Sequence, residues 1–307
     1  MTAKGTLVVV ALVVAVASQG GVGAAESRGT IAFVRYTVQS GHPRIYVVGA
    51  AGGRPRLLPL PVAAAQGPAW SPDGSRLAFV GGTNEVGRPN IADGDLYVAT
   101  ARGTVVRRLT RNRAQEAGAS WSPEGRRLVF VRSPRSGTRS SLFVTRVDGG
   151  TAARLTSGSS LDTEPSWSRN GWIAFLRIDP KVFQSGIWLI RPDGSGLRRI
   201  LIGVGVLSNP VWSPDGARLL VQEGRELVTV RPDGSGRRSV TTLSVDSRGN
   251  LADPQPAWSP DGEHVVYCQL RPGSLGISDI WVVAADGSGQ RRLTRSQELD
   301  TDPSWGG

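Results

Sequence analysis

The pentapeptide WSPDG stands at residues 70–74, 212–216 and 258–262, with the variants WSPEG at 121–125 and WSRNG at 167–171. A shortened copy, PSWGG, occupies residues 303–307. The tryptophans of these six copies are 51, 46, 45, 46 and 47 residues apart. A motif that recurs in register at this interval is typical of repeat architectures, in which each copy is one supersecondary unit.

Each full copy carries four strand signals. The first leads into the tryptophan, and the Ser-Pro-Asp-Gly segment after it favours a tight turn, because proline fixes φ and glycine tolerates positive φ. Alternating segments then predict second strands at 76–80, 127–131, 172–176, 218–222 and 264–268, and third strands at 95–99, 141–145, 186–190, 226–230 and 279–283. Short fourth strands led by arginine follow at 107–110, 153–156, 198–200, 237–240 and 291–294. Four antiparallel strands per repeat predict a β-propeller blade.

The two ends of the chain complete the count of blades. Residues 30–59 contain a second, a third and a fourth strand without a leading one, whereas residues 301–305 contain a leading strand with nothing after it. Together they make one blade, so the sequence predicts an all-β, six-bladed β-propeller closed by pairing of its N- and C-terminal strands. A β-helical solenoid is the alternative, but its coils would give shorter repeats.

The first residues predict export. Lys4 precedes an apolar run from Leu7 to Ala17, and small residues follow. We interpret residues 1–25 as a secretory signal peptide and residues 26–307 as the propeller, with an uncleaved anchor as the alternative. We therefore expect an extracytoplasmic protein that is periplasmic, bound to the cell wall or secreted, with no membrane span after cleavage. Cys268 is the single cysteine, which excludes an internal disulfide.

The chain is basic, with 36 Lys and Arg against 25 Asp and Glu and a net charge of +11. Such a balance favours acidic partners. Most of the paired arginines, however, begin predicted fourth strands at the outer edges of the blades, where charge prevents edge-to-edge association. Basic residues dispersed around a rim without interleaved aromatic residues argue against nucleic-acid binding. An anionic envelope polymer remains an alternative partner.

The WSPDG block, the alternating third strand, the Asp-Gly turn and the Arg-x-Leu-Thr ending resemble the WD-like repeats of TolB-type propellers over residues 29–305. The resemblance implies an exported six-bladed propeller that binds proteins in the periplasm. The namesake of the family also has an N-terminal α/β domain, to which we expect no counterpart here. Similar repeats form the non-catalytic propellers of prolyl oligopeptidase and dipeptidyl peptidase enzymes, so an accessory or glycan-binding module is an alternative.

Catalytic signals are weak. The two histidines are His42, in a predicted loop, and His264, which occupies the position held by Arg76 and Arg127 in other copies. A shared repeat position indicates a structural role. The sequence contains no Gly-x-Ser-x-Gly nucleophile elbow, and we predict that the protein is not an enzyme.

Acidic residues precede the tryptophans. Five residues before them stand Glu116, Asp162, Asp253 and Asp300, and three residues before them stand Glu164 and Asp302. The resemblance makes the leading strand the innermost one, so we expect these carboxylates at one mouth of a central channel. We hypothesise that the first four bind a hard cation such as Ca²⁺ or a basic group of a partner. The alternative is hydrogen bonding to backbone amides of the neighbouring blade.

These patterns favour a monomeric binding or scaffold protein of the cell envelope that engages a protein or peptide through one propeller face. Apart from the hypothesised Ca²⁺, the sequence predicts no cofactor. The segments between second and third strands, at 81–94 and 177–185, are predicted to be long variable loops and candidate contact sites.

Overall fold

The computed structural model describes residues 29–307, except for residues 38–40, 86–87, 105, 136, 138 and 204–205, and for the side chains of residues 83–93. The predicted signal peptide lies outside the described residues. Within them, no helix is long and apolar enough to cross a bilayer.

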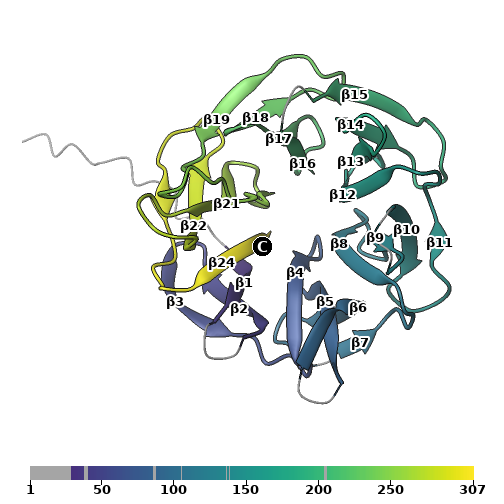
Figure 1. The fold of residues 1–307 in the computed structure, drawn as a ribbon, viewed down its shortest axis with the longest axis horizontal. Helices are drawn as coiled ribbons and strands as arrows, with labels where there is room; N and C mark the ends of the chain where they lie inside the picture. Colours follow the sequence, from purple (N-terminus) through teal and green to yellow (C-terminus); the bar gives the residue numbers. More distant parts are fainter. Residues whose placement is uncertain are drawn as a thin grey trace, which may run out of the picture.

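The described residues form six four-stranded antiparallel sheets around a central axis (Figure 1). The innermost, leading strands are β4 (Ala64–Trp70), β8 (Gln115–Trp121), β12 (Leu161–Trp167), β16 (Leu207–Trp212), β20 (Ala257–Trp258) and β24 (Leu299–Gly306). The second strands are β1 (Thr30–Tyr36), β5 (Arg76–Glu85), β9 (Arg127–Ser133), β13 (Ile173–Asp179), β17 (Leu219–Glu223) and β21 (His264–Leu270).

The third strands are β2 (Pro43–Gly49), β6 (Arg88–Thr100), β10 (Ser141–Arg146), β14 (Gln184–Ile190), β18 (Glu226–Val230) and β22 (Ser278–Ala284). The outer strands are β3 (Gly52–Leu57), β7 (Val106–Arg108), β11 (Ala153–Arg154), β15 (Arg198–Ile202), β19 (Arg238–Thr242) and β23 (Arg291–Arg292). The six-bladed all-β propeller is thereby confirmed.

The predicted closure is also confirmed. One sheet has the order β24-β1-β2-β3, and β24 pairs with β1 from Thr30 opposite Gly306 to Tyr36 opposite Leu299. The two ends of the chain approach closely here. A Cβ added to Gly29, whose φ is +109°, would lie 2.2 Å from the carbonyl oxygen of Gly306. Glycine is therefore required at the seam.

The core lies between neighbouring blades rather than within one of them. Phe33, Phe79, Phe130 and Phe175 on the second strands are fully buried. The tryptophan of one blade packs against the blade before it: Trp305 belongs to the same buried cluster as Val266 of β21. Each sheet thus covers its neighbour, and the buried residues form six clusters, one between each pair of neighbouring sheets.

The Asp of the WSPDG turn stabilises that turn. Asp73 Oδ1 accepts hydrogen bonds from Ser71 Oγ at 2.5 Å and from the Ser75 N–H at 3.1 Å. Asp215 and Asp261 accept the corresponding serine hydroxyl bond. The recurrence of Ser-Pro-Asp-Gly therefore follows from local turn chemistry.

The prediction of long loops at 81–94 and 177–185 is wrong. Strands β5 and β6 extend through most of the first segment, with Thr83 opposite Asn90, and β13 and β14 pair as far as Asp179 opposite Gln184. Backbone hydrogen bonding favours continuation of a hairpin even where the hydrophobic alternation has ended.

Candidate functional site: a carboxylate-lined channel

The residue three positions before each tryptophan has a left-handed backbone conformation in all six blades. The φ angles are +58°, +48°, +53°, +54°, +41° and +50° at Gly67, Gly118, Glu164, Asn209, Gln255 and Asp302. In five of the leading strands the pairing with the second strand shifts register at this point, which marks a β-bulge. A non-glycine residue with positive φ costs about 1–2 kcal/mol, and such strain is concentrated at functional sites.

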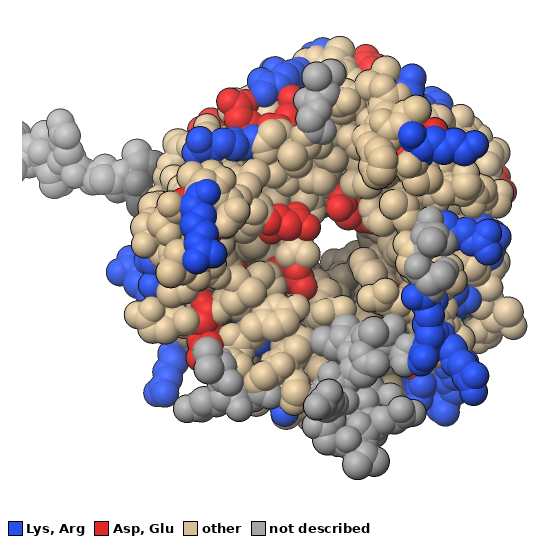
Figure 2. Space-filling view, viewed as in Figure 1, with Lys and Arg blue, Asp and Glu red and all other residues tan. Residues whose placement is uncertain are grey.

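These six residues with positive φ, hereafter the bulge residues, line a central cavity, hereafter the channel, of about 760 Å³. All six blades contribute to its wall. Figure 2 shows acidic side chains around the central opening, whereas Lys and Arg side chains lie around the outer rim. A ligand in the channel would therefore meet acidic side chains, although the net charge of the whole chain is positive.

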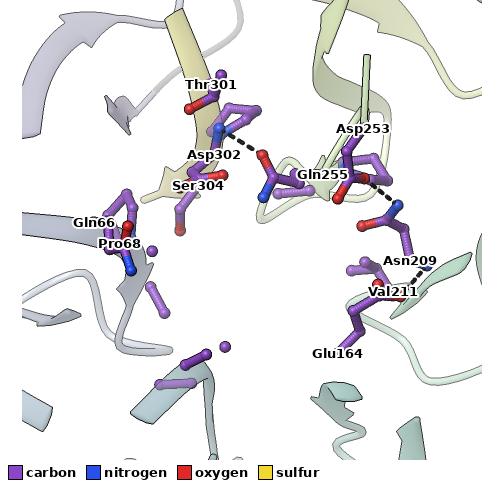
Figure 3. A pocket seen from close by; sticks show the side chains of 18 of the residues that line it. Gln66, Pro68, Glu164, Asn209, Val211, Asp253, Gln255, Thr301, Asp302 and Ser304 are labelled. Carbon is purple, nitrogen blue, oxygen red and sulfur yellow. Dashed lines mark hydrogen bonds between the residues drawn. The ribbon is translucent and has the colours of Figure 1, made fainter. Parts of the chain in front are cut away.

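The polar bulge side chains link one blade to the next, as Figure 3 shows. Glu164 Oε2 accepts a hydrogen bond of 2.5 Å from the Asn209 N–H, and Asn209 Nδ2 donates one of 2.6 Å to Asp253 Oδ1. Gln255 Oε1 accepts one of 3.1 Å from the Asp302 N–H. The bulges at Gly67 and Gly118 lack side chains, so polar groups are concentrated on one side of the channel.

Three carboxylates on that side have raised pKa values. Burial raises the pKa of Glu164 to about 7, with a further contribution from the nearby charge of Asp253. Burial and the same neighbour raise the pKa of Asp302 to about 6, although a hydrogen bond from the Gly67 N–H lowers it. Burial also raises the pKa of Asp253. No described Lys or Arg forms an ion pair with any of the three, which is why burial and mutual repulsion prevail.

The carboxylates five positions before the tryptophan have a different environment. Asp162 is buried and accepts bonds of 2.6 and 2.8 Å from the Arg177 guanidinium. Asp300 is bound by Arg35 in the same bidentate way. Glu116 is bound by Arg132 at 2.6 Å. Their charges are thus neutralised inside the blades.

Asp253 is the exception among the four residues of the cation hypothesis. The second-strand position that holds Arg35, Arg132 and Arg177 in the other three blades holds Gln269 here. Asp253 lines the channel, where part of the residue reaches solvent while the surrounding protein partly desolvates its carboxylate. The structure therefore brings Asp253 together with Glu164 and Asp302, and it separates Asp253 from the other three predicted residues. Whether Glu116, Asp162, Asp253 and Asp300 bind Ca²⁺ stays a prediction.

The arrangement suits binding of a positive charge. Three carboxylates in a partly desolvated cavity, with no basic partner in the described part of the chain, attract a cation more strongly than they would in water. None of the described residues that line the channel is His, Cys, Lys or Arg. The wall thus offers hydrogen-bond acceptors, prolines and the aromatic Tyr36, Trp70 and Trp121.

Comparison with known proteins shows which family has this architecture. Residues 25–184 match the family described as "TolB beta propeller domain". The chain is 31% identical over 149 residues to "Uncharacterized protein Atu1656" of Agrobacterium fabrum, covering 48% of this chain and 47% of the relative. It is 36% identical over 116 residues to the "Tol-Pal system protein TolB" of Anaeromyxobacter dehalogenans, covering 38% of this chain and 24% of that protein. The chain thus spans less than half the length of these relatives.

Structural similarity extends further than sequence similarity. TolB from Acinetobacter baumannii superposes with a TM-score of 0.74 over 92% of this chain and 67% of its own, at 18% identity. At that identity the likeness concerns the fold. The recurring repeats, the closed ring of six sheets and the match over more than half of its residues together establish that this chain belongs to the TolB β-propeller family.

Proposed function

We propose that this protein is a non-catalytic binding propeller of the extracytoplasmic space, and that it engages a protein or peptide by accepting a positively charged group in the channel. The observation that carries the proposal is the set of channel carboxylates, Glu164, Asp253 and Asp302, that no described basic side chain neutralises. By contrast, the buried carboxylates Asp95, Glu116, Asp162, Asp279 and Asp300 are each paired with arginine.

The energetic argument compares the free and the bound protein. Because the pKa values of these carboxylates are raised, their ionisation lowers the free energy of unfolding. A Lys, Arg or N-terminal ammonium group in the channel would offset that cost, and it would release the protons that the carboxylates carry. Affinity should therefore increase as the pH rises from 5 to 8, and it should decrease with salt.

The relationship to a Tol-Pal protein supports a protein partner, and the bulge strain supports a binding role. Glu164, Asn209, Gln255 and Asp302 all adopt a backbone conformation that glycine would adopt without strain. The sequence retains polar side chains at these four positions despite the strain, which is expected if the side chains contact a ligand.

Capture from envelope extract by the immobilised chain tests the proposal. The triple variant Glu164→Gln, Asp253→Asn, Asp302→Asn should lose the captured partner, with at least about tenfold weaker binding of the recovered protein, because the charges that attract it are removed. The matched control is Glu124→Gln, Asp148→Asn, Asp193→Asn, which makes the same change of net charge at exposed turns and should bind as the unmodified chain does. Equal loss in both variants, or turnover of a peptide or glycoside substrate, would contradict the proposal.

A further inference from the structure

A cluster of metal-ligating side chains lies apart from the channel, in the turn after Trp258. Asp261, Glu263 and His264 each offer one ligand atom, and these atoms all lie within 4.8 Å of one another. Ligand atoms around a tetrahedral zinc ion are about 3.3 Å apart, given bonds of about 2.0–2.1 Å. Both carboxylates are exposed, so small side-chain rotations can close the remaining distance.

Two local contacts orient side chains of the cluster. Asp261 Oδ1 accepts hydrogen bonds from Ser259 Oγ at 2.5 Å and from the Glu263 N–H at 2.9 Å. These bonds orient the carboxylate and leave Oδ2 available, in the way that outer contacts orient metal ligands. The His264 ring is tilted against the Trp305 ring of the next blade, at 6.1 Å between centroids.

The imidazole has an unmet bonding requirement. His264 Nδ1 is buried and has no hydrogen-bond partner among the described residues. Buried polar atoms are nearly always satisfied, and an unsatisfied one points to a bound water or ion. This observation is independent of the two carboxylates.

The repeat shows how unusual the donor set is. The equivalent turns end in Ser75-Arg76, Arg126-Arg127 and Ala217-Arg218. Arg76 and Arg127 also stack on the tryptophan of the next blade, at 4.9 Å from each ring centroid. His264 thus takes over the packing role of the arginine, but it replaces a permanent positive charge by a metal ligand, and Glu263 adds a second carboxylate.

We propose that Asp261, Glu263 and His264 form a site for a divalent transition metal, with Zn²⁺ as the expected occupant. One imidazole and two carboxylates are a donor set that zinc accepts, with water completing the coordination. The site lies at the opposite end of the leading strand from Asp253, so it is separate from the channel.

Isothermal titration of the untagged full chain with Zn²⁺ tests the site. We expect one ion per chain with micromolar affinity, and an imidazole nitrogen shift in ¹⁵N NMR that identifies the coordinating atom. His264→Arg restores the residue of the repeat and should keep the fold, yet it should weaken binding at least about tenfold. Glu263→Gln should weaken it as well.

Two controls locate the bound ion. Asp73→Asn changes the equivalent aspartate of the first turn, and Glu164→Gln with Asp302→Asn changes the channel; both should leave Zn²⁺ binding unchanged. The proposal is overturned if no heat is seen at millimolar Zn²⁺, if His264→Arg binds as tightly as the unmodified chain, or if only the channel variant loses the ion.

Discussion

Single residues two positions apart on β12 have opposite electrostatic environments. Asp162 is bound by the Arg177 guanidinium inside the blade, whereas Glu164 lines the channel next to Asp253 and has no basic partner among the residues that the structure describes. The bulge at Glu164 turns these two acidic residues to different surroundings. One carboxylate therefore contributes to stability, and the other is available to a ligand.

Glu164→Gln is expected to stabilise the folded protein at alkaline pH. The folded pKa, about 7, exceeds the ordinary value of 4.5, so the folded state binds more protons than the unfolded state between these pH values. The cost of ionising Glu164 is fully present above pH 7 and vanishes below pH 4.5. Urea denaturation should show a gain of about 1–3 kcal/mol at pH 8 and none at pH 4, since glutamine still accepts the Asn209 N–H bond.

Asp162→Asn provides the matched comparison on the same strand. It leaves Arg177 partly buried without its counter-charge, and it should destabilise the protein by about 3 kcal/mol at pH 8. If both substitutions changed the free energy of unfolding in the same direction, the distinction between paired and channel-facing carboxylates would be wrong.

The sequence contained part of this distinction. The acidic positions before the tryptophans were visible, and so were Arg35, Arg132 and Arg177 towards the ends of their second strands, with Gln269 at the same position in the blade of Asp253. Pairing them required the strand register, and a hydrophobic alternation of period two does not distinguish registers that differ by two residues. The shared position five residues before the tryptophan therefore groups Asp253 with three residues that the structure separates from it.

At the scale of the strand, the bulge in the leading strands is the element that creates the site. The sequence carried one signal of it: Gly67 and Gly118 occupy the position that Glu164, Asn209 and Asp302 occupy in other blades. Glycine among polar residues at one repeat position indicates a positive φ. Strand propensity alone could not reveal it, because propensity describes a whole segment and not the φ angle of one residue.

Substitutions at Gly118 should measure the strain of the bulge. Its φ is +48°, and an added Cβ would meet only ordinary contacts, with Pro165 at 3.6 Å and Val131 at 3.8 Å. Gly118→Ala should therefore cost about 1 kcal/mol through backbone strain alone. Gly118→Asn should cost less, because asparagine tolerates this conformation better. Guanidinium denaturation of both variants checks the order, and a neutral alanine variant would contradict the assigned conformation.

For the whole molecule, the pairing of β24 with β1 converts a row of six sheets into a ring. The sequence predicted this from the complementary ends of the chain, because an incomplete blade at each end leaves unpaired strand edges and one uncovered hydrophobic face. The shape of the channel could not be predicted in the same way, since it depends on six positive-φ residues acting together.

Removal of β24 should affect the entire ring. A chain ending at Glu298 loses the inner strand of one blade and the buried Trp305, which packs with Val266 of the preceding blade. We expect a loss of more than about 5 kcal/mol, comparable to the whole stability of many domains, and an increased radius of gyration in solution scattering. Trp305→Phe, which keeps the strand, should be clearly milder. A truncated chain that stays compact and melts at the original temperature would contradict closure by this strand.

The closed ring holds carboxylates in the channel that no basic side chain among the described residues neutralises. Carboxyl ¹³C NMR titration of the intact protein, assigned with Glu164→Gln and Asp302→Asn, measures this directly. The predicted apparent pKa values are about 7 for Glu164 and about 6 for Asp302, shared in part through their common neighbour Asp253. Titration of both residues near 4.5 and 3.8, their ordinary values, would contradict the claim.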